Sequence, residues 1–411
     1  MILPELLSPV GDLASFHAAL ENGANAVYVG IGRFNMRRTL DGKLEISQLP
    51  GMVAEAHAQN VKVFVTLNTI VYQDERTEVD TMLHHLKAAN IDAVIASDWA
   101  VIVRARALGL EIHASTQMSC SNADAVKFLA SQGIKRVVLA RECTLDEIKA
   151  IAQETGVPIE VFAHGAQCVA TSGRCFLSQL AYGCSANRGQ CLQPCRRRYH
   201  IKEVQDGVTS DAEFEIGAHF ILSAKDLCTL SILPEIVAAG IASLKLEGRA
   251  RNPEYVANVT RAYRMALDAI AKGTYDEEVQ AECWRLVNAV YHRSFATGLL
   301  LGRPGVEQFT PTDANFATEK KVYIGIVRNY YARAVVAEVL MHDHTLAPGD
   351  AIAIHGPTTG VLELTVGELY HDETRPECVA RGEWCTFAVP RRVRPGDKVY
   401  KRIEAEPVGL R

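Results

Sequence analysis

Short apolar, β-branched runs alternate with longer amphipathic stretches along most of the chain. Short runs bounded by turn residues predict buried strands, and apolar positions three and four residues apart predict helices. Strands that alternate with helices build parallel βαβ units. The expected strands are residues 4–7, 26–30, 62–67, 93–96, 111–115, 136–139, 159–163 and 243–246, and the expected helices are residues 13–22, 46–59, 76–89, 99–107, 123–132, 145–154 and 253–272.

Eight parallel strands are the number that closes a barrel, although a doubly wound open sheet could use the same segments. Closure is favoured because no glycine-rich phosphate loop follows the first strand. It is also favoured by polar residues that recur where strands end, since a barrel gathers these ends on the face that carries the chemistry. We therefore predict an α/β fold, a TIM-like (β/α)8 barrel. The polar residues are Ser8, Asn35, Asn68, Ser115, Gln117, Arg141, Glu142, His164, Glu247 and Arg249.

The alternation of strands and helices is interrupted between the seventh and eighth strands, where residues 164–241 replace one ordinary connection. Connections of this length are usually functional. From Lys321 onward, short alternating strands are separated by Pro-Gly-Asp turns, which predicts a small β-barrel domain. The expected domains are a barrel with a cysteine-rich insertion before its last strand over residues 1–296, a linker over 297–318, and a small C-terminal β-barrel over 319–411.

Composition places the chain among ordinary globular proteins, with 22% charged residues and a net charge of -5. This charge argues against a protein that coats nucleic acid over its whole surface, but it leaves room for a local basic site. The first residues lack the basic and apolar regions of a signal peptide, and no run reaches the ~18 apolar residues that span a membrane. A cytoplasmic protein with reduced thiols and no membrane association is expected.

Eleven cysteines need a reason in such a protein, and five of them fall between residues 168 and 195, among Gly, Ser, Asn, Gln and Arg. A cubane iron–sulfur cluster needs four thiolates, one for each iron, and Cys168, Cys175, Cys191 and Cys228 are the candidates. A structural zinc site also takes four cysteines, usually in C-x2–4-C pairs, and only Cys191 and Cys195 have that spacing. Spacing leaves both metals open, and Cys184 or Cys195 could replace one of the four.

The same segment is locally basic, because residues 165–202 contain no Asp or Glu. One interpretation is charge balance, in which arginines offset thiolates and sulfides. The other is a phosphate-binding patch for RNA. The sequence leaves the two interpretations even. The cations are Arg174, Arg188, Arg196, Arg197, Arg198 and Lys202.

Five stretches carry a resemblance: EVFAHGAQC at 160–168, SGRCFLS at 172–178, SANRGQCLQPCR at 185–196, LSAKDLC at 222–228 and LKLEGR at 244–249. Together they resemble the signature of the collagenase-like peptidase U family, over nearly the whole chain. Family members are widely labelled peptidases, but the resemblance implies oxygen insertion. One branch makes 5-hydroxyuridine at the tRNA wobble position with prephenate, one hydroxylates a cytidine of large-subunit ribosomal RNA, and a shorter one acts in ubiquinone synthesis.

The chain is most similar in length to the tRNA branch, so we expect a prephenate-dependent, 4Fe-4S-dependent tRNA uridine hydroxylase. The resemblance implies that Cys168, Cys175, Cys191 and Cys228 hold the 4Fe-4S cluster, which favours iron–sulfur over zinc. The expected partners are tRNA and a small dicarboxylate, prephenate, together with a second copy or a family paralogue in an oligomer.

Three sets of side chains are predicted to act at the barrel mouth. RNA phosphates need cations, a dicarboxylate needs arginines that bind both oxygens, and proton transfer needs titratable groups. The alternative for Arg249 is an ion pair with Glu247 or Glu142. The predicted phosphate ligands are Arg188, Arg196, Arg197 and Arg198, the dicarboxylate ligands are Arg37, Arg38, Arg141 and Arg249, and the acid–base groups are Glu142, His164 and Glu247.

A protease is the alternative from another functional class, beside hydroxylation of ribosomal cytidine. The sequence contains no H-E-x-x-H zinc motif and no G-x-S-x-G elbow. His164 stands near Cys168, but a thiolate committed to iron is not a free nucleophile. Proteolysis is therefore disfavoured on chemical grounds.

Overall fold

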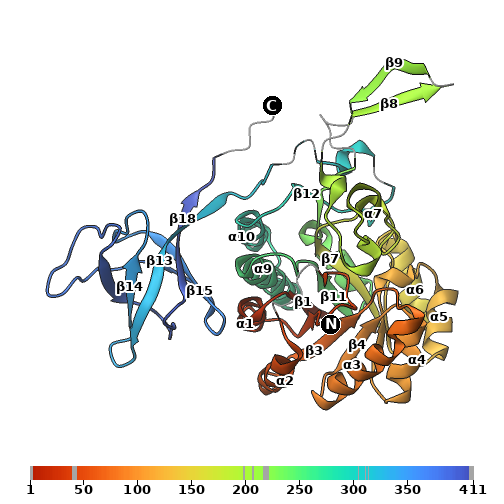
Figure 1. The fold of residues 1–411 in the computed structure, drawn as a ribbon, viewed down its shortest axis with the longest axis horizontal. Helices are drawn as coiled ribbons and strands as arrows, with labels where there is room; N and C mark the ends of the chain where they lie inside the picture. The colour runs from red at the N-terminus through yellow and green to blue at the C-terminus, as the bar shows by residue number, and fades with distance from the viewer. Residues whose placement is uncertain are drawn as a thin grey trace.

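Eight parallel strands close a barrel in this computed structural model, as the sequence predicts (Figure 1). The structure describes residues 3–38, 44–197, 200–205, 208–215, 222–303, 305–310, 312 and 314–406. The last barrel strand pairs in parallel with both the first and the seventh, which closes the ring. The staves are β1 (Glu5–Val10), β2 (Ala26–Val29), β3 (Lys62–Leu67), β4 (Ala93–Ala96), β5 (Ile112–Ala114), β6 (Arg136–Val138), β7 (Ile159–Gly165) and β11 (Ser243–Leu246).

Helices surround the barrel and bury their apolar faces against the outer side of the strands. Local caps fix where several helices begin: Asp12 accepts a hydrogen bond from the Ser15 amide, and Thr144 and Glu147 form a capping box. The helices are α1 (Leu13–Glu21), α2 (Leu49–Ala58), α3 (Arg76–Ala88), α4 (Trp99–Ala107), α5 (Ala123–Ser131), α6 (Leu145–Thr155), α8 (Leu233–Ala238), α9 (Pro253–Lys272) and α10 (Glu277–Asn288).

The long connection between β7 and β11 lies at the carboxyl end of the barrel. It contains α7 (Leu177–Tyr182), the hairpin of β8 (His200–Gln205) and β9 (Val208–Glu215), and β10 (Asp226–Cys228). Strand β10 pairs antiparallel with the end of β7, so that Cys228 lies opposite His164, and β12 (Phe295–Ala296) continues that sheet. The cysteine-bearing segment is therefore fixed to the barrel at the end where active sites form.

The C-terminal strands form a separate antiparallel sheet with its own apolar core, in the order β16-β15-β18-β13-β14-β17. A separate β-domain is thus confirmed, while the divisions at residues 296 and 318 stay predictions. Strand β16 packs on α1 and α9, and Arg391 binds Glu21 with both guanidinium nitrogens. The strands are β13 (Glu319–Tyr331), β14 (Val336–Met341), β15 (Ala351–Gly356), β16 (Gly360–Thr365), β17 (Trp384–Ala388) and β18 (Lys398–Glu404).

Among the helices that the structure describes, none combines the length and the apolar character that a membrane crossing requires.

Candidate active site at the barrel mouth

A polar cavity of about 70 Å³ opens at the carboxyl ends of the barrel strands. Lys245, Glu247 and Arg249 line it from the end of β11 and the loop that follows. They stand at every second position, and successive side chains of a strand point to opposite faces, so that all three face the barrel interior. The sequence signal LKLEGR thus places three charged side chains in one cavity.

Glu247 is a buried carboxylate that pairs with Arg37, whose Nη2 donates to Glu247 Oε1 at 2.8 Å. Burial acts to raise the pKa of Glu247, but the nearby Arg37, Arg251 and Arg141 outweigh it and lower that pKa to about 2. Glu247 is therefore ionised at neutral pH. It can hold a cation or accept a hydrogen bond, but it is not a general acid there.

Arg249 is buried and has no carboxylate within ion-pair distance among the described residues. Its Nη1 donates to Thr66 Oγ1 at 2.7 Å and to Asn35 Oδ1 at 3.3 Å. The expected alternative, an ion pair with Glu247 or Glu142, is not formed in the part of the chain that the structure describes. Burial lowers the pKa of Arg249 to about 10, so the guanidinium stays charged at neutral pH. A buried charge that has only neutral partners favours the binding of an anion.

Arg141 is a second cation at the mouth. Its guanidinium carbon lies 3.9 Å from the centroid of the Phe162 ring, and its Nη1 donates to the Ala166 carbonyl oxygen at 2.6 Å. Within the described residues it also has no carboxylate partner. Arg38, the remaining predicted dicarboxylate ligand, does not line the cavity. Arg38 instead packs against Gly189, so closely that a Cβ atom on residue 189 would clash with the backbone nitrogen and Cβ of Arg38.

Lys245 forms the floor of the cavity, and sequence reasoning did not single it out. Its Nζ donates to Glu160 Oε1 at 2.7 Å and lies 4.4 Å from the centroid of the Tyr28 ring. Glu160 also contacts Arg136, whose Nη1 lies 2.5 Å from Glu5 Oε1 near the opposite end of the barrel. A row of paired charges therefore runs through the barrel interior below the cavity, beside the apolar side chains of Leu7, Phe64 and Ile95. The available signal was the alternation of Lys245 with Glu247.

The other two predicted acid–base groups do not line the cavity. His164 is 1% exposed, and neither ring nitrogen has a hydrogen-bond partner. Its ring lies 5.5 Å from that of Tyr263 and 5.3 Å from that of Phe295. Burial, with smaller effects of His292 and Arg251, lowers the pKa of His164 to about 3, so the imidazole is neutral. Glu142 is exposed at the surface.

The arginines of the basic segment differ in what they bind. Arg188 is buried and binds both carboxylate oxygens of Glu75. Arg196 donates to Ser223 Oγ at 2.9 Å and to the carbonyl oxygen of Gln167 at 2.5 Å. Arg197 is exposed, with its guanidinium carbon 4.9 Å from the centroid of the Tyr182 ring. Arg188 and Arg196 thus hold the insertion together, Arg197 is available to a ligand, and Arg198 lies outside the described residues.

Three cysteines of the insertion, Cys168, Cys175 and Cys191, lie within electrostatic range of Cys195. Burial raises the pKa of the Cys195 thiol, Arg196 opposes this, and Cys191, Cys168 and Cys175 raise the pKa further. Cys168 is exposed and lines the mouth cavity. Positive charge also faces this group, because Arg37 interacts with Cys168 and Cys191.

Cys228 has different surroundings. Its thiol is buried on β10, with the Tyr263 hydroxyl 3.9 Å from Sγ, and burial together with Cys283 raises its pKa to about 12. Of the predicted ligands, Cys168, Cys175 and Cys191 each interact electrostatically with Cys195.

The thiols have the chemistry of a metal centre, because cysteine thiolates bind both iron–sulfur clusters and structural zinc ions. Among the described residues, no three His, Cys, Asp or Glu side chains lie close enough together to bind one metal ion. The Arg37 guanidinium, which interacts with Cys168 and Cys191, would offset the net negative charge of a cluster's thiolates and sulfides.

Comparison with known proteins places this geometry in a family. The chain is 37% identical over 408 residues to a protein named collagenase from Porphyromonas gingivalis, covering 97% of each chain. It is 32% identical to tRNA hydroxylation protein P1 of Bacillus subtilis, covering 97% of this chain and 94% of that one. It is 40% identical over 266 residues to a 23S rRNA 5-hydroxycytidine synthase of Escherichia coli, covering 65% of this chain and 39% of that one. Residues 11–310 match the family model described as peptidase family U32, and the chain belongs to that family.

Proposed function

We propose that this protein is an RNA-hydroxylating enzyme that converts the wobble uridine of tRNA to 5-hydroxyuridine in the cytoplasm, with prephenate as co-substrate. The observation that carries the proposal is the barrel-mouth cavity with two arginines, Arg141 and Arg249, that have no carboxylate partner among the described residues. Relatives named for tRNA and ribosomal RNA hydroxylation support the reaction class. The similarity to the tRNA hydroxylation protein of Bacillus subtilis extends over nearly both chains, which favours tRNA.

The dicarboxylate site follows from the charge count of the cavity. Glu247 compensates Arg37, and Glu160 compensates Lys245, which leaves Arg141 and Arg249 for the two carboxylates of prephenate. Charge-assisted pairs with arginine are among the stronger hydrogen bonds in proteins. The ionised Glu247 keeps Arg37 oriented toward the cavity. We assign the pyrimidine to the open side of this cavity, since one unstacked loop base can be splayed out at low cost.

A 4Fe-4S cluster would supply one-electron chemistry beside the cavity when bound. Cys168, Cys175 and Cys191 are the proposed ligands, and Cys168 also lines the cavity. For the fourth ligand, the family resemblance points to Cys228, while electrostatic proximity points to Cys195. Iron content and visible absorbance of Cys195→Ser and Cys228→Ser separate these two assignments, because only the true ligand's variant loses both.

The test of the function is mass spectrometry of nucleosides from a deletion strain and from the same strain carrying the gene. We expect one oxygen to be lost from a tRNA uridine in the deletion strain and regained on complementation. Loss on a ribosomal cytidine would move the protein to the other RNA branch. Unchanged tRNA and ribosomal RNA would refute the proposal.

A protease is the competing function, because two relatives from Porphyromonas gingivalis are named collagenase. The described residues contain no hydrogen bond between a histidine and a cysteine or serine side chain, and both ring nitrogens of His164 lack partners. A nucleophile activated by a neighbouring base is therefore not formed in this part of the chain. Cleavage of gelatin by purified protein, with loss of that activity in a Cys168→Ala variant, would favour the protease.

A further inference from the structure

The barrel-mouth cavity also has an uncharged group of lining side chains, Asn68, Ser115 and Gln117. Asn68 follows β3, and Ser115 and Gln117 follow β5, so all three lie at the carboxyl ends of the barrel strands. The chemistry proposed for the cavity uses only its charged groups. The amide and hydroxyl groups of the uncharged set are therefore available for another part of the substrate.

Hydrogen bonds fix which end of the Gln117 side-chain amide is left free. The Met36 backbone N–H donates to Asn68 Oδ1 at 3.2 Å, which identifies the other terminal atom of Asn68 as the nitrogen. Asn68 Nδ2 donates to Ser115 Oγ and to Gln117 Oε1, both at 3.1 Å. The Ser115 hydroxyl also donates to Gln117 Oε1. Because an amide nitrogen does not accept hydrogen bonds, the atom that receives both donors is the oxygen, and Nε2 of Gln117 is the free end.

The Nε2 group of Gln117 is both unpartnered and accessible. It has no hydrogen-bond acceptor within the part of the chain that the structure describes, and it is not one of the buried unpartnered atoms there. Gln117 is half-buried, whereas Asn68 and Ser115 are 7% and 3% exposed, so Gln117 is the member of the set nearest the opening. Gly173 of the insertion packs on its stem, since a Cβ atom at residue 173 would lie 2.7 Å from Gln117 Cγ. An anchored pair of N–H donors is therefore available to a ligand in exchange for bound water.

The position of the reaction on the base determines which atom such a donor can reach. Hydroxylation at C5 requires the pyrimidine to present its C5 edge to the cavity. The substituent on the adjacent C4 enters beside it, and this is a carbonyl oxygen in uracil but an amino group in cytosine. An N–H donor pairs with the oxygen, whereas it opposes the N–H groups of the amino substituent. Contacts to such exocyclic groups are also how other enzymes that modify nucleobases choose between bases.

Building on the RNA-hydroxylating function proposed above, we propose that Gln117 donates a hydrogen bond to O4 of the modified base and thereby selects uridine over cytidine. Asn68 and Ser115 act as positioning residues, because they hold Oε1 of Gln117 and so leave Nε2 for the base. Arg141 and Arg249 do not compete for this role, since they are assigned to the carboxylates of the co-substrate. The orientation of one amide thus distinguishes a uridine hydroxylase from an enzyme that accepts cytidine.

Fluorescence anisotropy with the purified full chain tests this assignment, with two labelled anticodon stem–loops that are identical except for uridine or cytidine at the wobble position. We expect the uridine RNA to bind about tenfold more tightly, because the cytidine complex lacks one hydrogen bond and leaves a donor unsatisfied. Gln117→Met keeps the length of the side chain, removes the donors and should abolish the difference. Gln117→Glu replaces the donor by an acceptor and should make the cytidine RNA the tighter ligand.

Asn68→Asp should reverse the amide without a change at Gln117 itself. A carboxylate at residue 68 only accepts hydrogen bonds, so Gln117 should turn Nε2 toward it and present Oε1 to the base. The preference should then shift toward cytidine, a result that a loss of stability would not produce.

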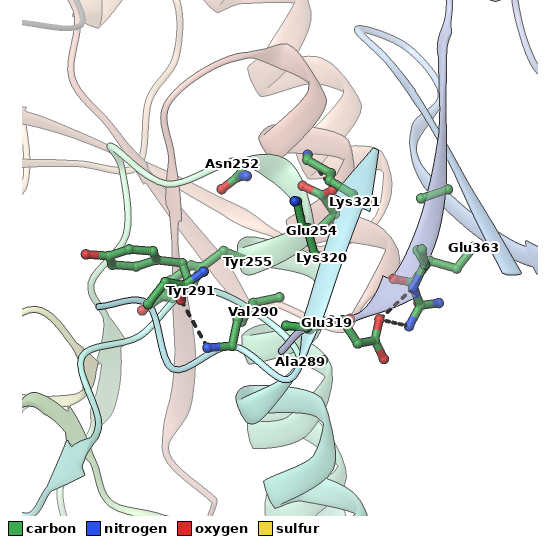
Figure 2. A pocket seen from close by; sticks show the side chains of 16 residues that line it. Asn252, Glu254, Tyr255, Ala289, Val290, Tyr291, Glu319, Lys320, Lys321 and Glu363 are labelled. Atoms are coloured by element: carbon green, nitrogen blue, oxygen red, sulfur yellow. Dashed lines mark hydrogen bonds and ion pairs between the residues drawn. The ribbon is translucent and has the colours of Figure 1, made fainter. Parts of the chain in front are cut away.

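The matched control is Asn252→Leu. Asn252 is an exposed amide that lines a different cavity, between the barrel and the C-terminal domain (Figure 2). Its side chain forms no capping hydrogen bond at the start of α9, so this variant should fold and keep the uridine preference.

Equal affinity of the wild-type protein for the two stem–loops overturns the assignment, as does a uridine preference that persists in Gln117→Glu or Asn68→Asp. The wild-type comparison keeps the test decisive if these variants do not fold. If the deletion strain lacks the oxygen on a tRNA uridine while the purified protein shows no preference, only the role of Gln117 is lost. If the strain lacks the oxygen on a ribosomal cytidine and the cytidine RNA binds more tightly, the proposed tRNA function is overturned as well.

Discussion

Replacement of Arg249 by methionine separates a ligand-binding cation from a structural one, because the two roles predict stability changes of opposite sign. Burial lowers the pKa of Arg249 from the ordinary 12.5 to about 10. That fall corresponds to about 3 kcal/mol by which folding disfavours the charged guanidinium at neutral pH. Hydrogen bonds to the neutral partners Thr66 and Asn35 offset part of this cost, each by about 1 kcal/mol.

We therefore expect Arg249→Met to be as stable as the wild-type protein or more stable by about 1–2 kcal/mol, which raises Tm by a few degrees. Loss of a charge-assisted contact to the co-substrate costs about 1.5–3 kcal/mol, a fall of about tenfold to a hundredfold in kcat/KM. Differential scanning calorimetry measures the first quantity, and tRNA hydroxylation at limiting prephenate measures the second.

Arg136→Met is the matched control, because the Arg136 side chain is only 11% exposed and does have carboxylate partners, Glu5 and Glu160. Removal of one partner from a buried ion pair costs about 3–5 kcal/mol, so this variant should be clearly destabilised. If Arg249→Met loses as much stability as Arg136→Met, Arg249 is structural. If it retains full hydroxylation at limiting prephenate, the anion site is wrong.

Three further predictions concern the mouth and the insertion. The pKa of Glu247 is lowered from 4.5 to about 2, so its contribution to stability is complete above pH 4.5 and is lost as the pH falls toward 2. In urea titrations over that range, the free energy of unfolding of the wild-type protein should fall by about 3 kcal/mol more than that of Glu247→Gln. The same fall in both proteins would contradict the assignment. Arg188→Ala removes the bidentate partner of the buried Glu75, which keeps only its ion pair with Arg33 and the Tyr72 amide, and should lower the free energy of unfolding by about 1.5–3 kcal/mol. Arg197→Ala should leave Tm unchanged and weaken RNA binding in a filter assay. Equal Tm values for the two variants would refute this division. Gly189 has φ +85°, and a Cβ atom there would lie 2.1 Å from the backbone oxygen of Asn35 in the mouth loop. Gly189→Ala should therefore loosen the insertion and speed the reaction of its cysteines with a thiol reagent. Unchanged reaction rates would show that the contact is unimportant.

The barrel could be predicted from the sequence because its information is local. Each strand is a short apolar run, and seven of the eight begin and end within two residues of their expected ranges, while β1 extends three residues further than expected. The polar residues that end these strands meet at one face because parallel strands share a direction. Glu247 and Arg249 line the mouth cavity, because they follow β11, which pairs in parallel with both β1 and β7.

The partners of the predicted site residues could not be read in the same way, because they come from distant parts of the chain. Arg188 forms its ion pair with Glu75, which lies 113 positions earlier in the chain. His164 lies near the end of β7, where a catalytic group would be expected, but Tyr263 of α9 and Phe295 of β12 pack against its ring. Such contacts depend on how the helices and the insertion pack, and periodicity within one segment carries no signal for them.

The row of charged side chains inside the barrel connects the cavity floor with the opposite end of the barrel through successive ion pairs. Glu160 lies between Arg136 toward the base and Lys245 at the cavity floor, and these cations outweigh its burial and lower its pKa. Were Glu160 neutralised, Lys245 would lose its counter-ion in a dry interior and favour the uncharged amine. The protonation state of Lys245, at the cavity end of the barrel, would then depend on residues at the opposite end. Activity could change its pH dependence through substitutions that never touch a substrate, and a search for such variants should begin at Arg136 and Glu5.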